Sequence, residues 1–257
     1  MAKFIIKGGK ALSGEVTLAG NKNSALKLMA ASLIGEGVSV LTNVPRIRDV
    51  EVMGALIKKL GAKITGIGTS TLTIDPAGIN SYELDPDLSM KIRASILLTA
   101  PLLVKFGKAI LIPPGGDDIG ERLLDTHFSM MKKMGVAIKR ENGRFILSWK
   151  EKKPQEIFLE EASVTATEMG LIMAASVSGK TVFSDVALEP HVADLVDFMG
   201  KMGVKIEGRG TTILSVLGTK ELKGASHKIV SDHIEGGTFA IAAAITGGHV
   251  IINGFEP

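Results

Sequence analysis

The stretch VEVMGALIKKLGAKI (residues 50–64) decides the fold, because its form returns twice further along the chain. Its apolar residues follow the spacing of one helix face, two lysines lie on the opposite face, and a glycine stands where the helix would end. A short β-type run, a turn and a second β-type run follow each time. The later copies are LLDTHFSMMKKMGVAI (123–138) and VADLVDFMGKMGVKI (192–206), at intervals of roughly 70 residues. The sequence therefore predicts three copies of an amphipathic helix followed by a β-hairpin.

A second kind of helix precedes each amphipathic one. These segments are apolar on nearly all sides and rich in alanine and serine, which is typical of helices buried on most sides. They are SALKLMAASLIGEG (24–37), RASILLTAPLLVKFG (93–107) and MGLIMAASVSG (169–179). Each leads into a β-type run, so the repeat is buried helix, strand, amphipathic helix, strand, strand. Such a long period predicts three similar subdomains around an axis, with the apolar helices inside.

The two ends of the chain fall outside this pattern. Residues 227–257 begin a fourth unit but contain only its buried helix and one strand, and residues 3–20 are two β-type runs that belong to no unit. We therefore expect a complete three-repeat domain over residues 22–229. Residues 1–21 and 230–257 are expected to form an incomplete portion of a second domain, in a chain that is truncated at its C-terminal side.

Composition excludes several classes of protein. The 257 residues are 45% hydrophobic with a net charge of +3, which is enough for one large domain or two smaller ones. The absence of cysteine excludes disulfides, thiolate metal sites and a thiol nucleophile. The basic residues are dispersed and aromatic residues are few, which argues against a nucleic-acid partner. The longest apolar run, ILLTAPLLV (96–104), is too short to span a membrane. We expect a cytoplasmic protein with small anionic ligands, no membrane partner, no metal and no cofactor.

Charged residues gather at the starts of the buried helices. Lys22 and Arg93 lie in or near first turns, where the helix dipole disfavours cations, so they are suited to holding a phosphate or carboxylate. The alternative is that both are ordinary surface residues. Two further starts, Thr165 to Glu168 and Asp232 to Glu235, fit the spacing of a capping box.

The loop ILIPPGGDDIGERLLDTH (110–127) combines glycines, acids and an arginine. Its adjacent glycines Gly115 and Gly116 permit another group to approach the backbone closely, and Arg122 could form two parallel hydrogen bonds to a phosphate. Asp117 could act as a general acid if burial raised its pKa. The alternative is a polar turn in which Asp118 caps the next helix, and His127 is interpreted as a packing residue.

Five segments together resemble the enolpyruvyl transferases, and among them the UDP-N-acetylglucosamine 1-carboxyvinyltransferases. They are AGNKNSALKLMAASLI (19–34), PPGGDDIGERLLDTH (113–127), SVTATEMGLIMAAS (163–176), EPHVADLVDFMGKMGVKIEG (189–208) and SDHIEGGTFAIAAAI (231–245). The resemblance runs in order over essentially the whole chain. It implies an inside-out α/β barrel fold, with three βαβαββ-type repeats and buried central helices in each of two domains. One domain would be complete here, with part of the second. At the start of the first buried helix, Lys22 and Asn23 resemble the pattern of the sugar-nucleotide branch of the family rather than that of the shikimate branch.

The reaction implied by the resemblance transfers enolpyruvyl from phosphoenolpyruvate to the 3-hydroxyl of UDP-N-acetylglucosamine and releases phosphate, without a cofactor. The phosphoenolpyruvate-binding residues would be Lys22, Asn23, Arg93 and Arg122. The UDP-N-acetylglucosamine-binding residues would be Asn23, Arg93, Arg122, Leu123, Leu124, Asp125, Ser163, Val164, Thr165 and Asp232. Asp117, where many members carry cysteine, would be the general acid.

The sequence also departs from the family pattern. Glu161 stands where some relatives have a basic residue, and Met169 replaces a frequent asparagine. The part that the resemblance leaves outside this chain would carry the general base and a further arginine, so we expect the 257 residues alone to turn over nothing detectable. A shikimate-branch transferase and a non-catalytic domain that keeps the fold for partner binding are the alternatives.

Overall fold

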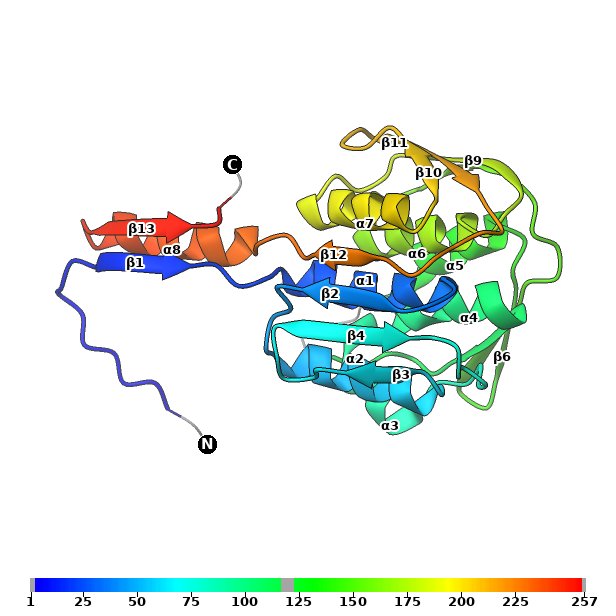
Figure 1. The fold of residues 1–257 in the computed structure, drawn as a ribbon, viewed down its shortest axis with the longest axis horizontal. Coiled ribbons are helices and arrows are strands. Elements are labelled where there is room, and N and C mark those ends of the chain that lie inside the picture. Colours follow the sequence, from blue (N-terminus) through cyan, green and yellow to red (C-terminus); the bar gives the residue numbers. More distant parts are fainter. Residues whose placement is uncertain (1–2, 117–122, 256–257) are drawn as a thin grey trace.

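The structure is a computed structural model that describes residues 3–116 and 123–255. Its main body contains the three repeats (Figure 1). The first repeat consists of α1 (Lys22–Ala31), the short 3-10 helix η1 (Ser32–Ile34), β2 (Ser39–Thr42), α2 (Arg48–Lys59), β3 (Lys63–Thr65) and β4 (Thr71–Asp75). The second consists of α3 (Pro86–Ser89), the 3-10 helix η2 (Arg93–Leu98), α4 (Thr99–Phe106), β5 (Lys108–Leu111), α5 (Asp125–Lys133), β6 (Ala137–Glu141) and β7 (Arg144–Ser148).

The third repeat has the same order. Its elements are β8 (Glu156–Phe158), α6 (Val164–Ala174), β9 (Gly179–Ser184), α7 (Pro190–Lys201), β10 (Lys205–Glu207) and β11 (Ile213–Gly218). The predicted sequence of buried helix, strand, amphipathic helix and hairpin is therefore confirmed in all three units. The glycines after the amphipathic helices, Gly61, Gly135 and Gly203, have φ of +103°, +88° and +104°, as a left-handed helix end requires.

Each repeat carries its own sheet, built on one plan. The first strand pairs antiparallel with the second strand of the hairpin, giving the orders β2-β4-β3, β5-β7-β6 and β9-β11-β10. A parallel strand or bridge lies on the other side of the first strand. It comes from β8 in the third sheet, from Glu83 beside Ile110 in the second, and from β12 (Ser226–Lys228) in the first. Because β12 follows the third repeat but pairs with the first, it closes the ring of subdomains.

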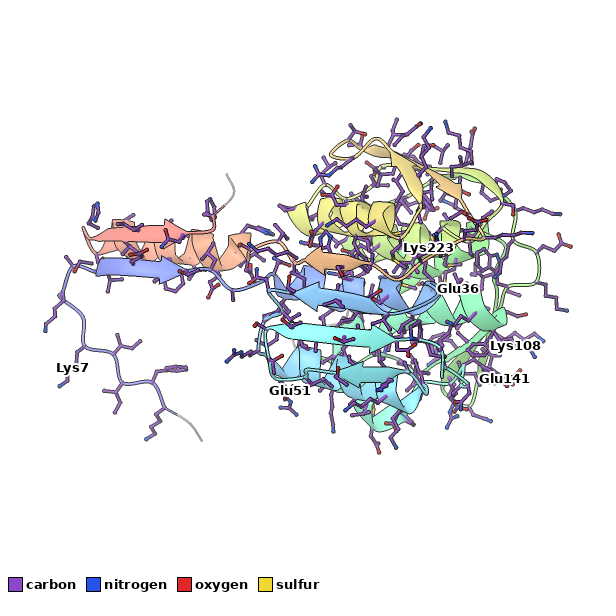
Figure 2. The ribbon with its side chains drawn as sticks, viewed as in Figure 1. Lys7, Glu36, Glu51, Lys108, Glu141 and Lys223 are labelled. Atoms are coloured by element: carbon purple, nitrogen blue, oxygen red, sulfur yellow. The ribbon has the colours of Figure 1, made fainter. Side chains whose placement is uncertain are left out.

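The core lies between the repeats, on the apolar helices. Every residue of α1 from Ser24 to Ala31 is buried, and so is every residue of α6 from Ala166 to Ala174. The outer helices bury one face only: α2 buries Val52, Met53 and Leu56 and exposes its terminal lysines. Where the first and third repeats meet, Glu36 and Lys223 lie side by side (Figure 2), and the amide of Glu36 donates to the carbonyl oxygen of Leu222 at 2.7 Å.

A smaller layer projects from this body (Figure 1). It consists of α8 (His233–Ile245) and the parallel pair β1 (Ser13–Thr17) and β13 (His249–Asn253). The extended segment before β1, with Lys7, lies away from the other elements (Figure 2). The layer joins the body through two adjacent connections: the amide of Asn21 donates to the carbonyl oxygen of Val230, and the amide of Asp232 donates to that of Ala19, both at 2.8 Å.

The structure corrects the predictions of a capping box at the starts of α6 and α8. The residue that caps α6 is Ser163, whose side chain accepts from the amide of Ala166, so the capping box from Thr165 to Glu168 was wrong. Asp232 does cap α8 and accepts from the amides of Ile234 and Glu235. The Glu235 carboxylate does not close that box, because it accepts from the amide of Ala19 instead.

Candidate functional site

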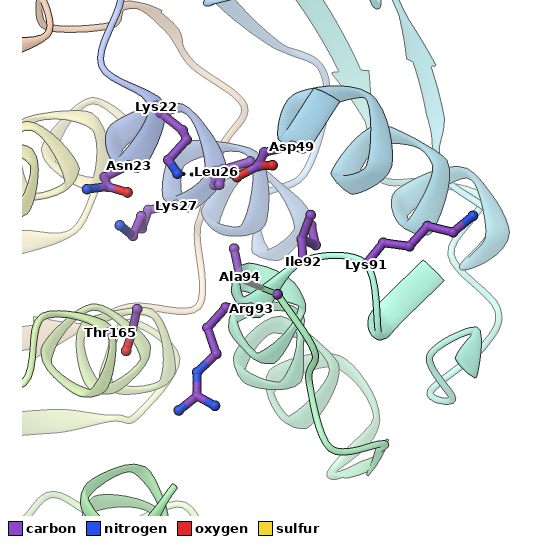
Figure 3. A pocket seen from close by; sticks show the side chains of 11 residues that line it. Lys22, Asn23, Leu26, Lys27, Asp49, Lys91, Ile92, Arg93, Ala94 and Thr165 are labelled. Atoms are coloured by element: carbon purple, nitrogen blue, oxygen red, sulfur yellow. Dashed lines mark ion pairs between the residues drawn. The ribbon is translucent and has the colours of Figure 1, made fainter. Parts of the chain in front are cut away.

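The starts of the three inner helices surround one cavity of about 180 Å³ (Figure 3). The cavity is lined by Lys22, Asn23, Leu26 and Lys27 of α1, Asp49 of α2, Lys91, Ile92, Arg93 and Ala94 around the start of η2, Gly116, and Thr165 of α6. Four of these side chains are cations and one is a carboxylate. Lys22 and Arg93, predicted from separate repeats, therefore share one cavity.

Lys22 is placed by the cap of α1. Asn21 is fully buried, and its side-chain oxygen accepts from the amide of Ser24 at 2.8 Å, which fixes the start of the helix at Lys22. The Lys22 ammonium lies 3.4 Å from the Asp49 carboxylate, and its side chain is half exposed. A half-exposed ion pair of this kind contributes little to stability.

Arg93 is the first residue of η2 and lies against the loop that contains Asp117. Its Nη2 donates to the carbonyl oxygen of Leu123 at 3.0 Å. On the other side of the loop, a Cβ added to Gly116 would lie 3.3 Å from the backbone nitrogen of Arg93, and Gly116 has φ of +116°. Both flanks of segment 117–122 therefore contact Arg93. The predicted residues Asp117 and Arg122 lie within that segment, outside the described residues.

The start of α6 faces a buried histidine. The His127 Nε2 and the Thr165 hydroxyl lie 2.6 Å apart, and the imidazole is 6% exposed. Burial, and then the positive charge of Arg93, lower the pKa of His127 to about 4, against the opposing effect of Glu161. The ring is therefore neutral near pH 7, and the interpretation of His127 as a packing residue agrees with its burial.

Apart from Asn23, the other predicted residues that the structure describes do not line the cavity. Leu123 and Asp125 are exposed, and Leu124 precedes α5. Ser163 and Val164 lie at the start of α6, next to Thr165. Asp232 is connected to the site through Asn21, whose side-chain amide donates to the Asp232 carboxylate at 3.3 Å. Glu161, one of the departures from the family pattern, accepts from the Thr126 hydroxyl at 2.8 Å.

Sequence reasoning missed several residues of the site, among them Asp49, Lys91 and a buried ion pair. Lys27 lines the cavity from within α1, and its ammonium lies 3.4 Å from the carboxylate of Glu168 in α6. The Lys27 side chain is 5% exposed and that of Glu168 is fully buried. The available signal was a lysine in the middle of a helix that is otherwise apolar on all sides, because such a lysine needs a buried counter-charge.

The arrangement is suited to a small anion. Helix starts present free amides and a positive dipole end, and Lys22 and Arg93 add two fixed cations. An arginine can bind a carboxylate or phosphate through two bonds, and cations held in advance stabilise charge that develops during a reaction. In the part of the chain that the structure describes, no group of three or more metal-binding side chains occurs, and no helix has the length and apolarity to cross a membrane.

Sequence comparisons show the family to which the chain belongs. The family described as EPSP synthase (3-phosphoshikimate 1-carboxyvinyltransferase) matches residues 6–257. The chain is 40% identical over 257 residues to UDP-N-acetylglucosamine 1-carboxyvinyltransferase from Treponema denticola, and 40% identical to the protein of that name from Trichlorobacter lovleyi. All of this chain is covered in both comparisons, but it spans only 60% and 61% of the relatives' length.

Solved structures share the fold. The enolpyruvyl transferase NikO from Streptomyces tendae superposes with a TM-score of 0.79 at 24% identity, covering 90% of this chain and 55% of NikO. EPSP synthase from Acinetobacter baumannii gives a TM-score of 0.74 at 20% identity, covering 97% of this chain and 57% of the synthase. The expected inside-out α/β fold is thereby confirmed. On the family match over residues 6–257, the chain belongs to the EPSP synthase (3-phosphoshikimate 1-carboxyvinyltransferase) family.

Proposed function

We propose that this chain carries substrate-binding helices of a transferase that moves enolpyruvyl from phosphoenolpyruvate to the 3-hydroxyl of UDP-N-acetylglucosamine. Phosphate would be released, in a step of peptidoglycan precursor synthesis in the cytoplasm. The observation that carries the proposal is the shared cavity of Lys22, Arg93 and Thr165, each at the start of a different inner helix. The choice of acceptor is supported by the names of the relatives at 40% identity.

Phosphoenolpyruvate would occupy the cavity. Its phosphate and carboxylate would contact Lys22 and Arg93, with Asn23 and Arg122 as further ligands. The acceptor oxygen would bond to C2 of phosphoenolpyruvate and lose its proton to the general base expected outside this chain, while Asp117 as general acid would protonate C3. This role of Asp117 is supported by the position of its neighbour Gly116 in the cavity lining. This addition gives a tetrahedral ketal phosphate. Loss of a proton from C3 and of phosphate from C2 would then restore the double bond, and the cations would stabilise the charge that builds up on the leaving phosphate.

UDP-N-acetylglucosamine would lie along the rim of the same cavity. Asn23 would orient the sugar beside phosphoenolpyruvate, and Arg93 and Arg122 would contact both substrates. The remaining contacts would come from Leu123, Leu124, Asp125, Ser163, Val164, Thr165 and Asp232. These residues lie at the starts of α5, α6 and α8. The start of α5 has no side-chain cap, so its amides and positive dipole end favour the anionic diphosphate.

The smaller layer would belong to a second domain. Its helix and strand expose Ile234, Ile241, Ile245 and Ile251, each more than half exposed, which is unusual for a finished surface. We assign residues 22–229 to the three-repeat domain and residues 1–21 and 230–257 to the second one. Further elements over that apolar face would place a second wall opposite the cavity.

Binding of the two candidate acceptors tests the proposal. In isothermal titration calorimetry we expect saturable binding of UDP-N-acetylglucosamine and none of shikimate 3-phosphate, because the rim offers contacts for a nucleotide sugar. Tighter binding of shikimate 3-phosphate would assign the chain to the shikimate branch instead. If a folded chain bound neither acceptor nor phosphoenolpyruvate, it would be a non-catalytic domain. As a matched control, Arg209→Met removes a cation that is paired with Asp197 on α7 and does not line the cavity.

A further inference from the structure

One wall of the cavity contains a buried ion pair that the proposed reaction does not use. Lys27 comes from α1 and Glu168 from α6, so the pair joins two different repeats. The ammonium lies 3.4 Å from the nearer carboxylate oxygen, and neither side chain is more than 5% exposed. Lys27 lines the cavity while Glu168 lies behind it. An anion in the cavity would therefore lie closer to the ammonium of Lys27 than to the carboxylate of Glu168.

The surroundings of the pair make the ionised carboxylate unfavourable. Neither oxygen of Glu168 accepts a hydrogen bond from any described residue. Burial raises the pKa of Glu168 to about 8, although the charge of Lys27 opposes the shift. Burial also lowers the pKa of Lys27, with Glu168 opposing. The pair therefore has two protonation states. In one state the two residues hold a single proton between them, and in the other each residue is protonated. The pKa of this change belongs to the pair and not to either residue alone.

Other charged groups face the pair from the neighbouring elements. The positive charge of Lys22 disfavours the Lys27 ammonium, while Glu189, which precedes α7, favours that ammonium and disfavours an ionised Glu168. His191 of α7 is buried with both ring nitrogens unpartnered among the described residues, and burial lowers its pKa to about 3, so it stays neutral. Further titratable groups on the elements packed around the cavity include Asp49 of α2, Lys91 and Arg93 beside η2, His127 of α5 and Asp194 of α7.

We propose that the Lys27–Glu168 pair couples anion binding in this cavity to the uptake of one proton from solvent. An anion stabilises the nearby ammonium and repels the carboxylate behind it. The pair responds by binding a second proton, so that Glu168 becomes neutral and Lys27 keeps its charge towards the anion. The net charge of the pair changes from zero to +1. This inference rests on the proposed function only in that the cavity must hold anions.

Sulfate is the probe for this coupling, because it is a divalent anion with no proton to exchange between pH 7 and 9. Its affinity for the 257-residue chain is measured from amide chemical shifts in NMR titrations at pH 7, 8 and 9. We expect binding about tenfold weaker at pH 9 than at pH 7, since the second proton is already present at the lower pH and must be taken up at the higher one. A separate titration follows the carboxyl ¹³C shift of Glu168 at pH 8, which we expect to move towards its protonated value as sulfate is added.

The control is the double variant Lys27→Met with Glu168→Leu, which replaces the pair by apolar side chains and leaves no lone buried charge. We expect its sulfate affinity to change less than twofold between pH 7 and 9. Equal affinity at both pH values in the unaltered chain, an unmoved Glu168 signal, or full pH dependence in the double variant would each overturn the coupling. Failure of the proposed function gives a different result: no saturable sulfate binding at any pH, or binding that Lys22→Met leaves unchanged.

Discussion

Arg93 donates a hydrogen bond from Nη2 to the backbone carbonyl oxygen of Leu123, at 3.0 Å. The same residue packs against Gly116, so it contacts the chain on both sides of segment 117–122. Since Arg93 is also the first residue of η2 and lines the cavity, it connects an inner helix start to the loop that contains Asp117. Arg93 therefore lines the cavity and also contacts the described residues on both sides of segment 117–122.

Replacing Arg93 should weaken phosphoenolpyruvate binding. We expect Arg93→Met to reduce affinity by tenfold or more, because a charge-assisted hydrogen bond contributes about 1.5–3 kcal/mol. Arg93→Lys keeps the charge but loses the planar fork, and we expect it to recover only part of the affinity. Calorimetric titration measures both. Arg144→Met removes an arginine that is paired with Glu83 at the surface, and it should bind as tightly as the unaltered chain. Equal affinity in all four proteins would contradict a binding role for Arg93.

Because residue 117 is an aspartate and not a cysteine, we predict that the chain resists fosfomycin, an epoxide that alkylates thiols. A carboxylate is a poorer nucleophile than a thiolate, so the chain should form no covalent adduct during prolonged incubation. Asp117→Cys should gain one adduct, detected as a mass increase of the intact protein. An adduct mapped to Asp117 in the unaltered chain would show that this prediction is wrong.

Asp194 should contribute far more to stability than Asp197 on the same helix. The buried Asp194 carboxylate accepts from the Ser24 hydroxyl of α1 and from the Val230 amide at 3.2 Å, and it lies 2.7 Å from the His227 Nε2 of β12. It thereby joins the first repeat, the third repeat and the strand that closes the ring. We expect Asp194→Asn to lower the free energy of unfolding by about 2–4 kcal/mol.

The matched variant is Asp197→Asn, which disrupts an exposed pair with Arg209. Its cost should stay below about 1 kcal/mol, because exposed ion pairs contribute little. Urea unfolding followed by circular dichroism measures both values. Similar losses in the two variants would mean that the Asp194 network does not hold the ring together.

His127 should make the fold less stable in acid. Burial lowers its folded-state pKa from 6.5 to about 4, so between these values the unfolded chain binds a proton that the folded chain does not. Stability therefore falls as the pH drops from 6.5 to 4, by up to about 3 kcal/mol from this residue. His127→Gln keeps a hydrogen-bonding group for Thr165 without titrating, and it should lose correspondingly less stability over this range.

The control for that experiment is His249→Gln, which changes an exposed histidine at the start of β13 and should follow the pH profile of the unaltered chain. Unfolding free energies at pH 7, 5.5 and 4 distinguish the variants. A His127→Gln profile that is parallel to the unaltered one would contradict the buried neutral imidazole.

The fold could be predicted because its signals are local and repeated three times. The spacing of Met53 and Leu56, the lysines opposite them and Gly61 after them each reflect one helix with one buried face. The alternation of such helices with apolar ones could be predicted in the same way, because the spacing of apolar residues shows which faces of a helix are buried. The cap of α6 was mispredicted because Ser163 and Thr165 are both good capping residues, and spacing alone does not decide between them.

The site was predicted only in part. Lys22 and Arg93 were identified because a cation in a first helical turn conflicts with the helix dipole, which is a local signal. Lys27 and Glu168 were missed because they belong to different repeats, and their pairing depends on how α1 packs near α6. Lys22 and Asp49 lie in the same repeat, and their contact was missed because it depends on how α1 packs against α2. Asp117 and Arg122 lie outside the described residues, so their roles stay predictions.

The most direct test is a crystal structure of the 257-residue chain with phosphoenolpyruvate and UDP-N-acetylglucosamine at saturating concentrations. We predict that the phosphate or carboxylate of phosphoenolpyruvate lies in the cavity, within hydrogen-bonding distance of both the Lys22 ammonium and the Arg93 guanidinium. A phosphoenolpyruvate molecule bound elsewhere, with Lys22 and Arg93 contacting only protein groups, would contradict the assignment of this cavity.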